Sequence, residues 1–311
     1  MKRAIGRGLA GLAGIVVCGL LACAQGGSAP GLESRAPRGE PLLWRAEAPE
    51  GAAAFYLLGS VHMGDKRMLE LGDTIRQAYD ASDELVVEID LSSVTPSDVQ
   101  VLVARFAVLP ESRTLEDVLS EETWQALTSY LDSRGVAPDS LVRMKPWFVS
   151  LAIVQIELTR AGYQEELGVD QLFIGDAAGT KPIVPLETLA SQFEVFDSTS
   201  RDVQEILLAD TLSRVDELAG TTDDLVLAWE EGDEARLEEL VFQGLSETPE
   251  LDAFYERLFF ERNRRMAARL LELAQDGKTR FVVLGAGHML GEEGIPALLA
   301  RRDYRVRLLG D

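Results

Sequence analysis

The chain has 311 residues, of which 46% are apolar and 26% are charged, as is usual for a soluble globular protein with a sizeable core. The formal net charge of −22 argues against DNA or RNA as a partner, because phosphate binding requires concentrated Lys and Arg. We interpret this charge as a solvated acidic surface, with weak attraction for cations or basic peptides as the alternative. The two cysteines, Cys18 and Cys23, both lie near the N-terminus, so no disulfide holds the rest of the chain together.

The N-terminus has the pattern of a bacterial lipoprotein signal. A basic segment at residues 1–7 precedes a short apolar segment at residues 9–21, which is typical of a secretory signal and short for a transmembrane helix. The following Leu20-Leu21-Ala22-Cys23 resembles a lipobox, in which the chain is cut before the cysteine and the cysteine is lipidated. An ordinary signal with a chance cysteine is the alternative. We predict a signal peptide at residues 1–22 and lipidation of Cys23.

A tether is expected after the lipidated cysteine. Residues 23–41 are rich in Gly, Ser, Pro and Ala, a composition that predicts a flexible link to a folded domain at residues 42–311. Ala24 follows the cysteine, which by resemblance to enterobacterial sorting favours the outer membrane. The expected location is the bacterial cell envelope, with the domain lipid-anchored and facing the periplasm.

The folded part begins with a β-turn-α-β pattern. Apolar runs and turn signals predict two strands, at residues 42–48 and 53–58, followed by a Gly59-x-x-His62 turn. A helix with 3.6-residue periodicity is predicted at 66–81. The strand predicted next, at 84–89, is apolar almost throughout, which is typical of a strand covered on both faces.

The middle of the chain is predicted to be mostly helical. Between residues 96 and 196 the candidate N-caps are Thr114, Ser120 and Ser140. A short buried strand at 182–186, ending at Glu187, interrupts the helices. The best-defined helical patterns lie at 147–161, 200–218, 222–231, 234–242 and 249–275.

The C-terminal segment repeats the first pattern: a strand at 279–284, a Gly285-x-x-His288 turn, a helix at 292–301 and a strand at 304–309. We therefore predict an α/β fold with a central mixed sheet built from two β-GxxH-α-β units and a largely helical insert between them. The similar lengths of the two units suggest a pseudo-twofold arrangement.

Four candidate site residues follow predicted strands: His62, Glu88, Glu187 and His288. Ligands bind at the carboxyl ends of strands in open α/β sheets, so these side chains meet if the strands are parallel neighbours. Two imidazoles and a carboxylate suit a divalent metal ion such as zinc, manganese, cobalt or iron. Glu88 is a candidate metal ligand or general base. The alternative is structural: hydrogen-bonded histidines at strand ends and a glutamate on an exposed face.

The predicted helix at 249–275 adds two candidates. Arg262 shares an apolar stripe with Leu258, Met266 and Leu270, because these residues are four apart. A buried Arg needs an acidic partner, for which Glu88 and Glu187 both qualify, unless its head group extends to water instead. Asn263 is placed to donate to a substrate carbonyl or a ligand.

Several of these motifs together resemble the TraB/GumN family, which is grouped with the TIKI metalloproteases and, more distantly, with ChaN-like and erythromycin-esterase-like proteins. The resemblance covers residues 42–309. It rests on the two Gly-x-x-His motifs and on the following segments in the same order: Val86-Val87-Glu88, Gly168-Val169-Asp170, Leu186-Glu187-Thr188 with Gln192, and Glu261-Arg262-Asn263 with Met266.

The resemblance implies an α/β fold and a site made of His62, His288 and Glu88, with Arg262 and Asn263 at further family positions. TIKI members are described as metal-dependent proteases with manganese or cobalt as candidate ions, and TraB-like bacterial members are linked to shutting down peptide pheromones. The first hypothesis is thus a lipid-anchored, metal-dependent hydrolase acting on peptides or proteins, with manganese, cobalt or zinc as its ion.

In this hypothesis His62, Glu88 and His288 hold the ion, Glu88 or Glu187 transfers protons, and Arg262 or Asn263 stabilises the oxyanion. A second hypothesis is a non-catalytic envelope lipoprotein that binds peptide or haem, as the ChaN-like relatives suggest. A third is a structural partner in envelope assembly.

Overall fold

A computed structural model describes residues 39–309 apart from residues 50, 52, 244, 246 and 247. The predicted signal peptide at 1–22, the lipidation site Cys23 and nearly all of the predicted tether at 23–41 lie outside the described residues. Among the described helices, none is both long and apolar enough to cross a membrane.

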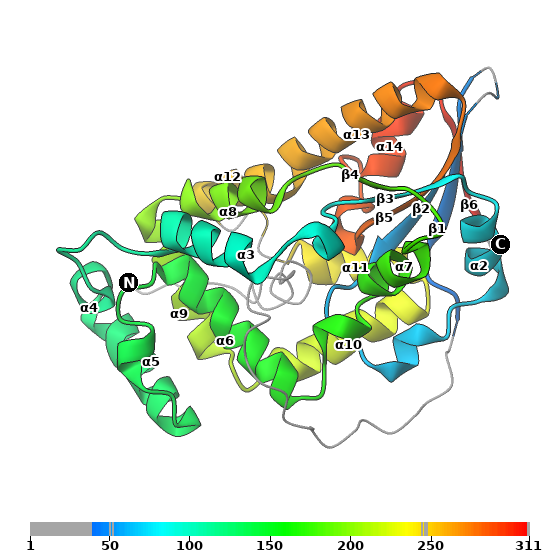
Figure 1. Cartoon of the computed structure of the whole chain (residues 1–311). Helices are drawn as coiled ribbons and strands as arrows, with labels where there is room; N and C mark the ends of the chain where they lie inside the picture. Colours follow the sequence, from blue (N-terminus) through cyan, green and yellow to red (C-terminus); the bar gives the residue numbers. More distant parts are fainter. Residues whose placement is uncertain (1–38, 50, 52, 244, 246–247, 310–311) are drawn as a thin grey trace.

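Six strands form one mixed sheet, in the order β4-β3-β5-β2-β1-β6 (Figure 1). The four strands β4, β3, β5 and β2 are parallel to one another, and β1 is antiparallel to both of its neighbours. This confirms the predicted α/β class and the mixed sheet. The strands are β1 (Leu43–Glu47), β2 (Ala54–Ser60), β3 (Glu84–Val87), β4 (Ile183–Pro185), β5 (Thr279–Gly285) and β6 (Arg305–Leu309).

The two β-GxxH-α-β units interleave at the centre of the sheet. Strands β2 and β5 are adjacent, the first unit continues to β3 beyond β5, and the second continues to β6 beyond β2 and β1. The crossover from β2 to β3 and the crossover from β5 to β6 run in opposite directions across the sheet. Because such crossovers are right-handed, the helix of one lies on the opposite face of the sheet from the helix of the other. The two units are therefore related by an approximate twofold axis along the strands, and β1 interrupts this symmetry.

Contacts of neighbouring residues on β5 identify the two covered faces. The Phe281 ring packs on Tyr79 of α2 (Asp73–Asp80) and on Phe173 of α7 (Val169–Ala177), with centroids 5.5 and 4.7 Å apart. Arg280 points to the other face, where it donates to the carbonyl of Leu273 at the end of α13 (Glu261–Leu273). Apolar residues thus face helices on both sides, as expected for strands that are apolar almost throughout.

The insert between β3 and β5 is largely helical, as predicted (Figure 1). Its main helices are α3 (Pro96–Leu102), α4 (Leu115–Val118), α5 (Glu121–Arg134), α6 (Pro146–Arg160), α7, α8 (Leu189–Asp197), α9 (Arg201–Ser213), α10 (Leu218–Glu230), α11 (Glu234–Val241), α12 (Pro249–Tyr255) and α13. Two π-helical turns, η3 (Val103–Ala107) and η6 (Glu256–Phe260), continue α3 and join α12 to α13. The last helix, α14 (Ile295–Ala300), packs beside α13 and precedes β6.

Besides shifts of a few residues at the ends of elements, four details differ from the sequence-based prediction. The helix expected at 66–81 is split into a 3₁₀ turn, η1 (Lys66–Leu69), and α2, because the poor helix former Gly72 lies between them. The predicted helix at 249–275 contains the π-helical turn η6. Thr114 and Ser120 cap helices as predicted, but Ser140 lies inside a 3₁₀ turn, η4 (Pro138–Ser140).

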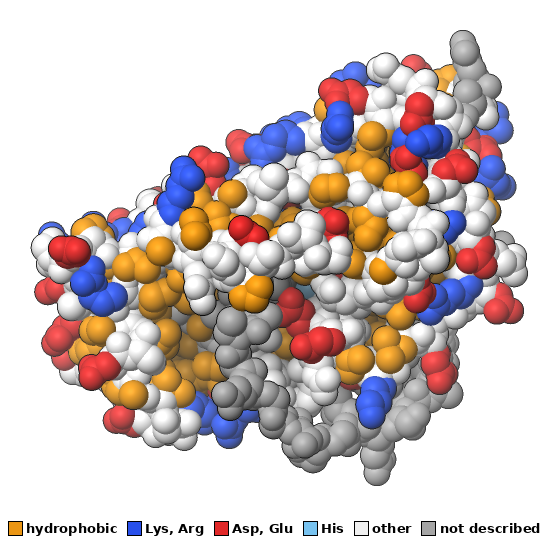
Figure 2. All heavy atoms as spheres, in the orientation of Figure 1, with side chains coloured by type: hydrophobic (Ala, Val, Ile, Leu, Met, Phe, Trp, Pro, Cys, Tyr) orange, Lys and Arg blue, Asp and Glu red, His pale blue; other side chains and the backbone are white. Residues whose placement is uncertain are grey.

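The fourth difference concerns β4, which was expected to be buried. It lies at the edge of the sheet with half-buried and exposed side chains. Its Pro185 has no N–H for a second ladder, and proline in a strand is typical of an edge position. On the surface, Lys and Arg side chains are scattered among acidic ones over the visible face (Figure 2).

Candidate functional site

The four predicted site residues all follow strands at one edge of the sheet. His62 comes two residues after β2, Glu88 directly follows β3, and Glu187 comes two residues after β4. His288 ends the 3₁₀ turn η8 (Ala286–His288) that follows β5. Because β2, β5, β3 and β4 are parallel neighbours, their carboxyl ends meet at this edge.

Three of these side chains converge on the backbone of Gly285. The Gly285 N–H donates to Oε1 of Glu88 at 2.6 Å, and the same oxygen lies 3.6 Å from Nε2 of His288. A Cβ atom added at Gly285 would lie 3.1 Å from Oε1 of Glu88 and 3.2 Å from Nε2 of His62. The glycine therefore leaves the space in which both imidazoles approach one carboxylate.

Asp170, in the first turn of α7, orients His62. Its Oδ2 lies 3.2 Å from Nδ1 of His62, and both side chains are buried. The backbone of Gly168 makes this approach possible, since a Cβ there would lie 2.4 Å from the carbonyl oxygen of His62. Because a carboxylate accepts hydrogen bonds, Nδ1 carries the proton and Nε2 keeps its lone pair.

Asn263, on α13, orients His288 in the same sense. Its Nδ2 donates to the carbonyl of Glu293 at 2.7 Å, so its Oδ1 is the acceptor that lies 2.5 Å from Nδ1 of His288. The proton of His288 is thus on Nδ1, and Nε2 carries the lone pair facing Glu88. Burial lowers the pKa of His288 to about 3, despite the nearby negative charge of Glu88.

These contacts correct one prediction about Asn263. Its side chain is fully buried, and both of its polar atoms are engaged with His288 and Glu293. The structure therefore presents Asn263 as a residue that positions His288 rather than as a donor to a substrate carbonyl.

Arg262 links Glu88 to Glu187. Its Nη2 donates to Oε2 of Glu88 at 2.7 Å and to Oε2 of Glu187 at 2.6 Å, and its Nη1 donates to the carbonyl of Leu258 at 2.9 Å. With 4% of its surface exposed, Arg262 does not extend to water. The predicted acidic partners are both present, and the alternative of a solvated head group is wrong.

The carboxylate of Glu88 is held in its ionised form. Burial alone would raise the pKa of Glu88, but His288, Arg262, His62 and the Gly285 N–H together lower it well below the ordinary value. Gln192, on α8, donates to Oε2 of Glu88 at 3.0 Å. That oxygen therefore receives two hydrogen bonds, whereas Oε1 accepts the backbone N–H of Gly285 and faces the histidines.

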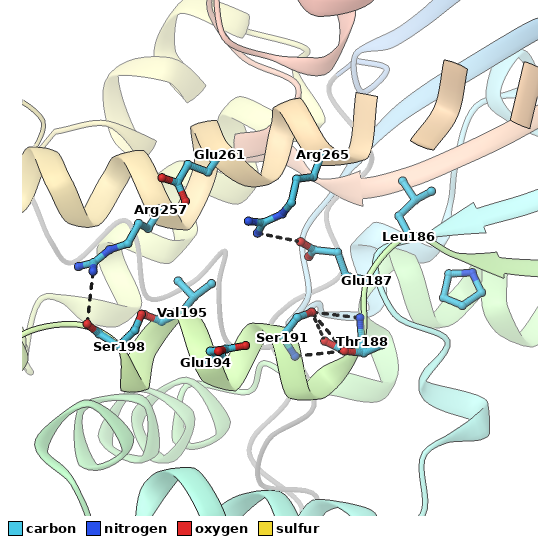
Figure 3. A pocket seen from close by; sticks show the side chains of 11 residues that line it. Leu186, Glu187, Thr188, Ser191, Glu194, Val195, Ser198, Arg257, Glu261 and Arg265 are labelled. Atoms are coloured by element: carbon cyan, nitrogen blue, oxygen red, sulfur yellow. Dashed lines mark hydrogen bonds and ion pairs between the residues drawn. The ribbon is translucent and has the colours of Figure 1, made fainter. Parts of the chain in front are cut away.

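Glu187 lies at the end of an open trough of about 700 Å³ (Figure 3). One wall is α8 with the Ser198 that follows it, and the other is the helical segment that carries Arg257 and Arg265. Arg265 points toward Glu187, with its Nη2 4.0 Å from Oε1. Glu187 links the trough to the buried site, because Arg262 donates to both Glu187 and Glu88.

Two residues of this site, Asp170 and Gln192, have no role that the sequence predicts. Each contacts a predicted site residue from a different helix. The only signal for them in the sequence is that they occur in segments resembling the TraB/GumN family. Neither periodicity nor composition distinguishes them from other polar residues on amphipathic helices.

In chemical terms the site offers two imidazole nitrogens with lone pairs and one ionised carboxylate oxygen, the donor types that divalent transition metals prefer. Both histidines also have the partner on Nδ1 that is usual for metal-binding histidines. Within the described part of the chain, however, no three His, Cys, Asp or Glu side chains have the spacing of an assembled metal centre. The donors fit a metal, while their spacing is not that of a closed coordination shell.

Comparison with known proteins gives one family and several relatives. The sequence profile of the TraB/PrgY/gumN family matches residues 42–308. YbaP of Escherichia coli K12, an uncharacterized protein, is 28% identical over 256 residues, which cover 80% of this chain and 89% of YbaP. The metalloprotease TIKI1 of Danio rerio is 24% identical over 304 residues, which cover 81% of this chain and 60% of TIKI1. No protein of solved structure is a significant match.

Proposed function

Because this chain belongs to the TraB/PrgY/gumN family, we propose that it is a metal-dependent hydrolase that cleaves peptides or proteins at the bacterial envelope. The observation that carries the proposal is the convergence of His62, His288 and Glu88 on Gly285. Relatives described as metalloproteases add support, at about 24% identity.

The metal would be manganese, cobalt or zinc, held by Nε2 of His62, Nε2 of His288 and Oε1 of Glu88. When bound, such an ion lowers the pKa of a water molecule and polarises a carbonyl group. Oε1 has a lone pair left for this role after accepting the Gly285 N–H. Asp170 and Asn263 would keep both rings turned toward the ion.

The proton and charge chemistry falls to Glu88, Glu187 and Arg262. Glu88 would be either a ligand of the ion or the general base; where it does not bind the ion, its ionised carboxylate next to the histidines makes it the better-placed base. Glu187 reaches the same point indirectly, through Arg262. Arg262 would stabilise negative charge on a substrate oxygen only after giving up one of its present hydrogen bonds, and otherwise its role is to hold Glu88 in place.

Cleavage of a peptide library with added manganese, cobalt or zinc tests the proposal directly. We expect turnover with at least one ion, and loss of both turnover and bound metal in His62→Ala, measured by elemental analysis of the purified chain. Metal bound equally by the wild type and His62→Ala would contradict this site. If no ion supports turnover but peptide or haem binds, with haem followed by its Soret band, the non-catalytic alternative replaces the hydrolase.

The proposed location depends on Cys23. A lipid on this residue would hold the domain at the outer membrane facing the periplasm. In a bacterial host, wild-type protein should sediment with the membranes, and Cys23→Ala should appear in the soluble periplasmic fraction. Membrane association of Cys23→Ala equal to that of the wild type would exclude lipidation as the anchor.

A further inference from the structure

A second cavity lies beside α3 and is mostly apolar. Helix α3 has no fully buried residue, although it carries valine and leucine side chains. It forms one wall of a groove of about 610 Å³, a volume within the usual range of roughly 300–1,000 Å³ for ligand sites. The apolar lining includes Leu91, Val99, Val103, Met144 and Phe148.

The groove is lined by residues that follow Glu88 and Asp170 in the chain. Leu91 lies three residues after Glu88, in the 3₁₀ turn η2 (Leu91–Ser93). Gln171, at the other side, directly follows the Asp170 that orients His62. The wall formed by Val103 belongs to the π-helical turn η3, and π-helical turns occur frequently at functional sites. Two segments that carry site residues, after Glu88 and at Asp170, therefore also line the groove.

The charge at the rim distinguishes between classes of ligand. Glu165 and Glu166 border the groove, and Glu166 is exposed. Among the described residues that line it, none is Lys or Arg, and the whole chain has a formal charge of −22. An anionic lipid head group would be repelled here, whereas a lysine, arginine or amino terminus next to an apolar segment would be attracted.

We propose that this groove binds an apolar segment of a peptide whose positive charge lies against the exposed Glu166. The inference rests on the proposed peptidase function and names the substrate class of that site. The leucine-sized side chains of the peptide fill the space between α3, Met144 and Phe148. The carboxylate of Glu166 selects a basic residue on the same peptide.

Binding to the purified full chain tests this, with fluorescence anisotropy as the readout and EDTA present so that turnover does not interfere. The probe is a fluorescein-labelled peptide of three leucines followed by two lysines. We expect Val99→Asp to weaken binding at least tenfold, since it puts a charge into the apolar wall. Val101→Asp is the matched control: Val101 is on the same helix but 63% exposed, and we expect its variant to bind within twofold of the wild type.

Two further peptides test the chemistry of the ligand. Replacing the three leucines by serines should weaken binding at least tenfold. Replacing the lysines by glutamates should also weaken binding, and Glu166→Lys should reverse that preference. Equal effects of Val99→Asp and Val101→Asp, or no response to either charge change, would overturn the proposal. Competition by laurate as strong as that by the leucine–lysine peptide would overturn it in favour of a lipid site.

These measurements separate the groove from the proposed chemistry. Peptide binding that follows the expected pattern without cleavage by any metal-loaded sample would leave the groove assignment standing and remove the hydrolase. Cleavage that is equally fast for leucine-containing and leucine-free peptides, and unchanged in Val99→Asp, would do the reverse.

Discussion

The two Gly-x-x-His turns end adjacent parallel strands, yet their histidines are held by different chemistry. His62 faces the carboxylate of Asp170 from α7, and His288 faces the amide of Asn263 from α13. A carboxylate partner strengthens an imidazole as a ligand as well as orienting it, whereas a neutral amide only orients the ring. The repeated motif therefore fixes position, and the helical elements decide how each ring behaves.

The two histidines, each with its partner on Nδ1, share a single carboxylate, that of Glu88. Oε1 of Glu88 faces the histidines, and Oε2 is held by Arg262 and Gln192. Removing this carboxylate, or the Arg262 that holds it, should disturb both histidines together. Changing the outer partner of one histidine should disturb only that histidine.

The largest effect is expected for Arg262→Leu. It leaves Glu88 and Glu187 buried without their cation, and breaking such a pair costs about 3–5 kcal/mol of stability. Urea denaturation of the purified chain measures this loss. The matched control is Arg265→Leu, because Arg265 is 60% exposed and its closest approach to Glu187 is 4.0 Å. Surface pairs of this kind contribute about 0–1 kcal/mol. Equal losses in the two variants would therefore contradict a buried ion pair between Arg262 and Glu88.

The next effect is an acid sensitivity that belongs to His288. The folded pKa of His288 is about 3, and the unfolded value is near 6.5. Between these values the unfolded chain binds more protons, so stability is present above pH 6.5 and is lost as the pH falls. The slope for one proton approaches about 1.4 kcal/mol per pH unit.

Unfolding free energies of the metal-free chain between pH 7 and pH 5 measure this slope. In this range the contribution of Glu88 is small, because its protonation in the unfolded chain begins near the ordinary value of 4.5. His288→Asn should show a shallower pH dependence than the wild type, and His62→Asn should retain the part due to His288. Identical slopes in the wild type and His288→Asn would mean that His288 is not buried in its neutral form.

The arrangement of His62, Glu88 and His288 around Arg262 could largely be predicted from the sequence, because it depends on short-range signals. Strand ends are marked by apolar runs and glycines, so the sequence predicts that His62, Glu88 and His288 follow strands at one edge of the sheet. The four-residue spacing around Arg262 predicted its acidic partners.

The outer partners of the histidines could not be predicted in this way. Asp170 lies 108 residues from His62, and Asn263 lies 25 residues from His288. Which polar residue of a helix reaches a strand end depends on how that helix packs on the sheet, and periodicity does not encode packing. The break at Gly72 and the edge position of β4 likewise depend on residues that the hydrophobic pattern does not weigh.

Asp170→Asn separates the two histidines by metal affinity. Losing the carboxylate partner of one histidine should weaken metal binding about 10–100-fold, the usual effect of removing an outer-shell partner. Asn263→Asp is the reciprocal variant: it gives His288 a carboxylate partner but loses the hydrogen bond from Nδ2 to the Glu293 carbonyl, so we expect a loss of stability without a weaker imidazole ligand. Isothermal titration with manganese, cobalt and zinc measures both. Unchanged metal affinity in Asp170→Asn would show that the partner of His62 only orients the ring.

The smallest effect is expected for Gln192→Ala. It removes one hydrogen bond of 3.0 Å to Oε2 of Glu88, but Arg262 still donates to the same oxygen at 2.7 Å, so no buried charge is left without a partner. We expect a loss of about 0.5–1.5 kcal/mol, the usual net contribution of one hydrogen bond. Gln125→Ala on α5, where the side chain donates to the exposed Glu121, is the control and should change stability less. A loss for Gln192→Ala as large as that for Arg262→Leu would place the support of Glu88 on α8 rather than on α13, and both histidines would then depend on the trough wall.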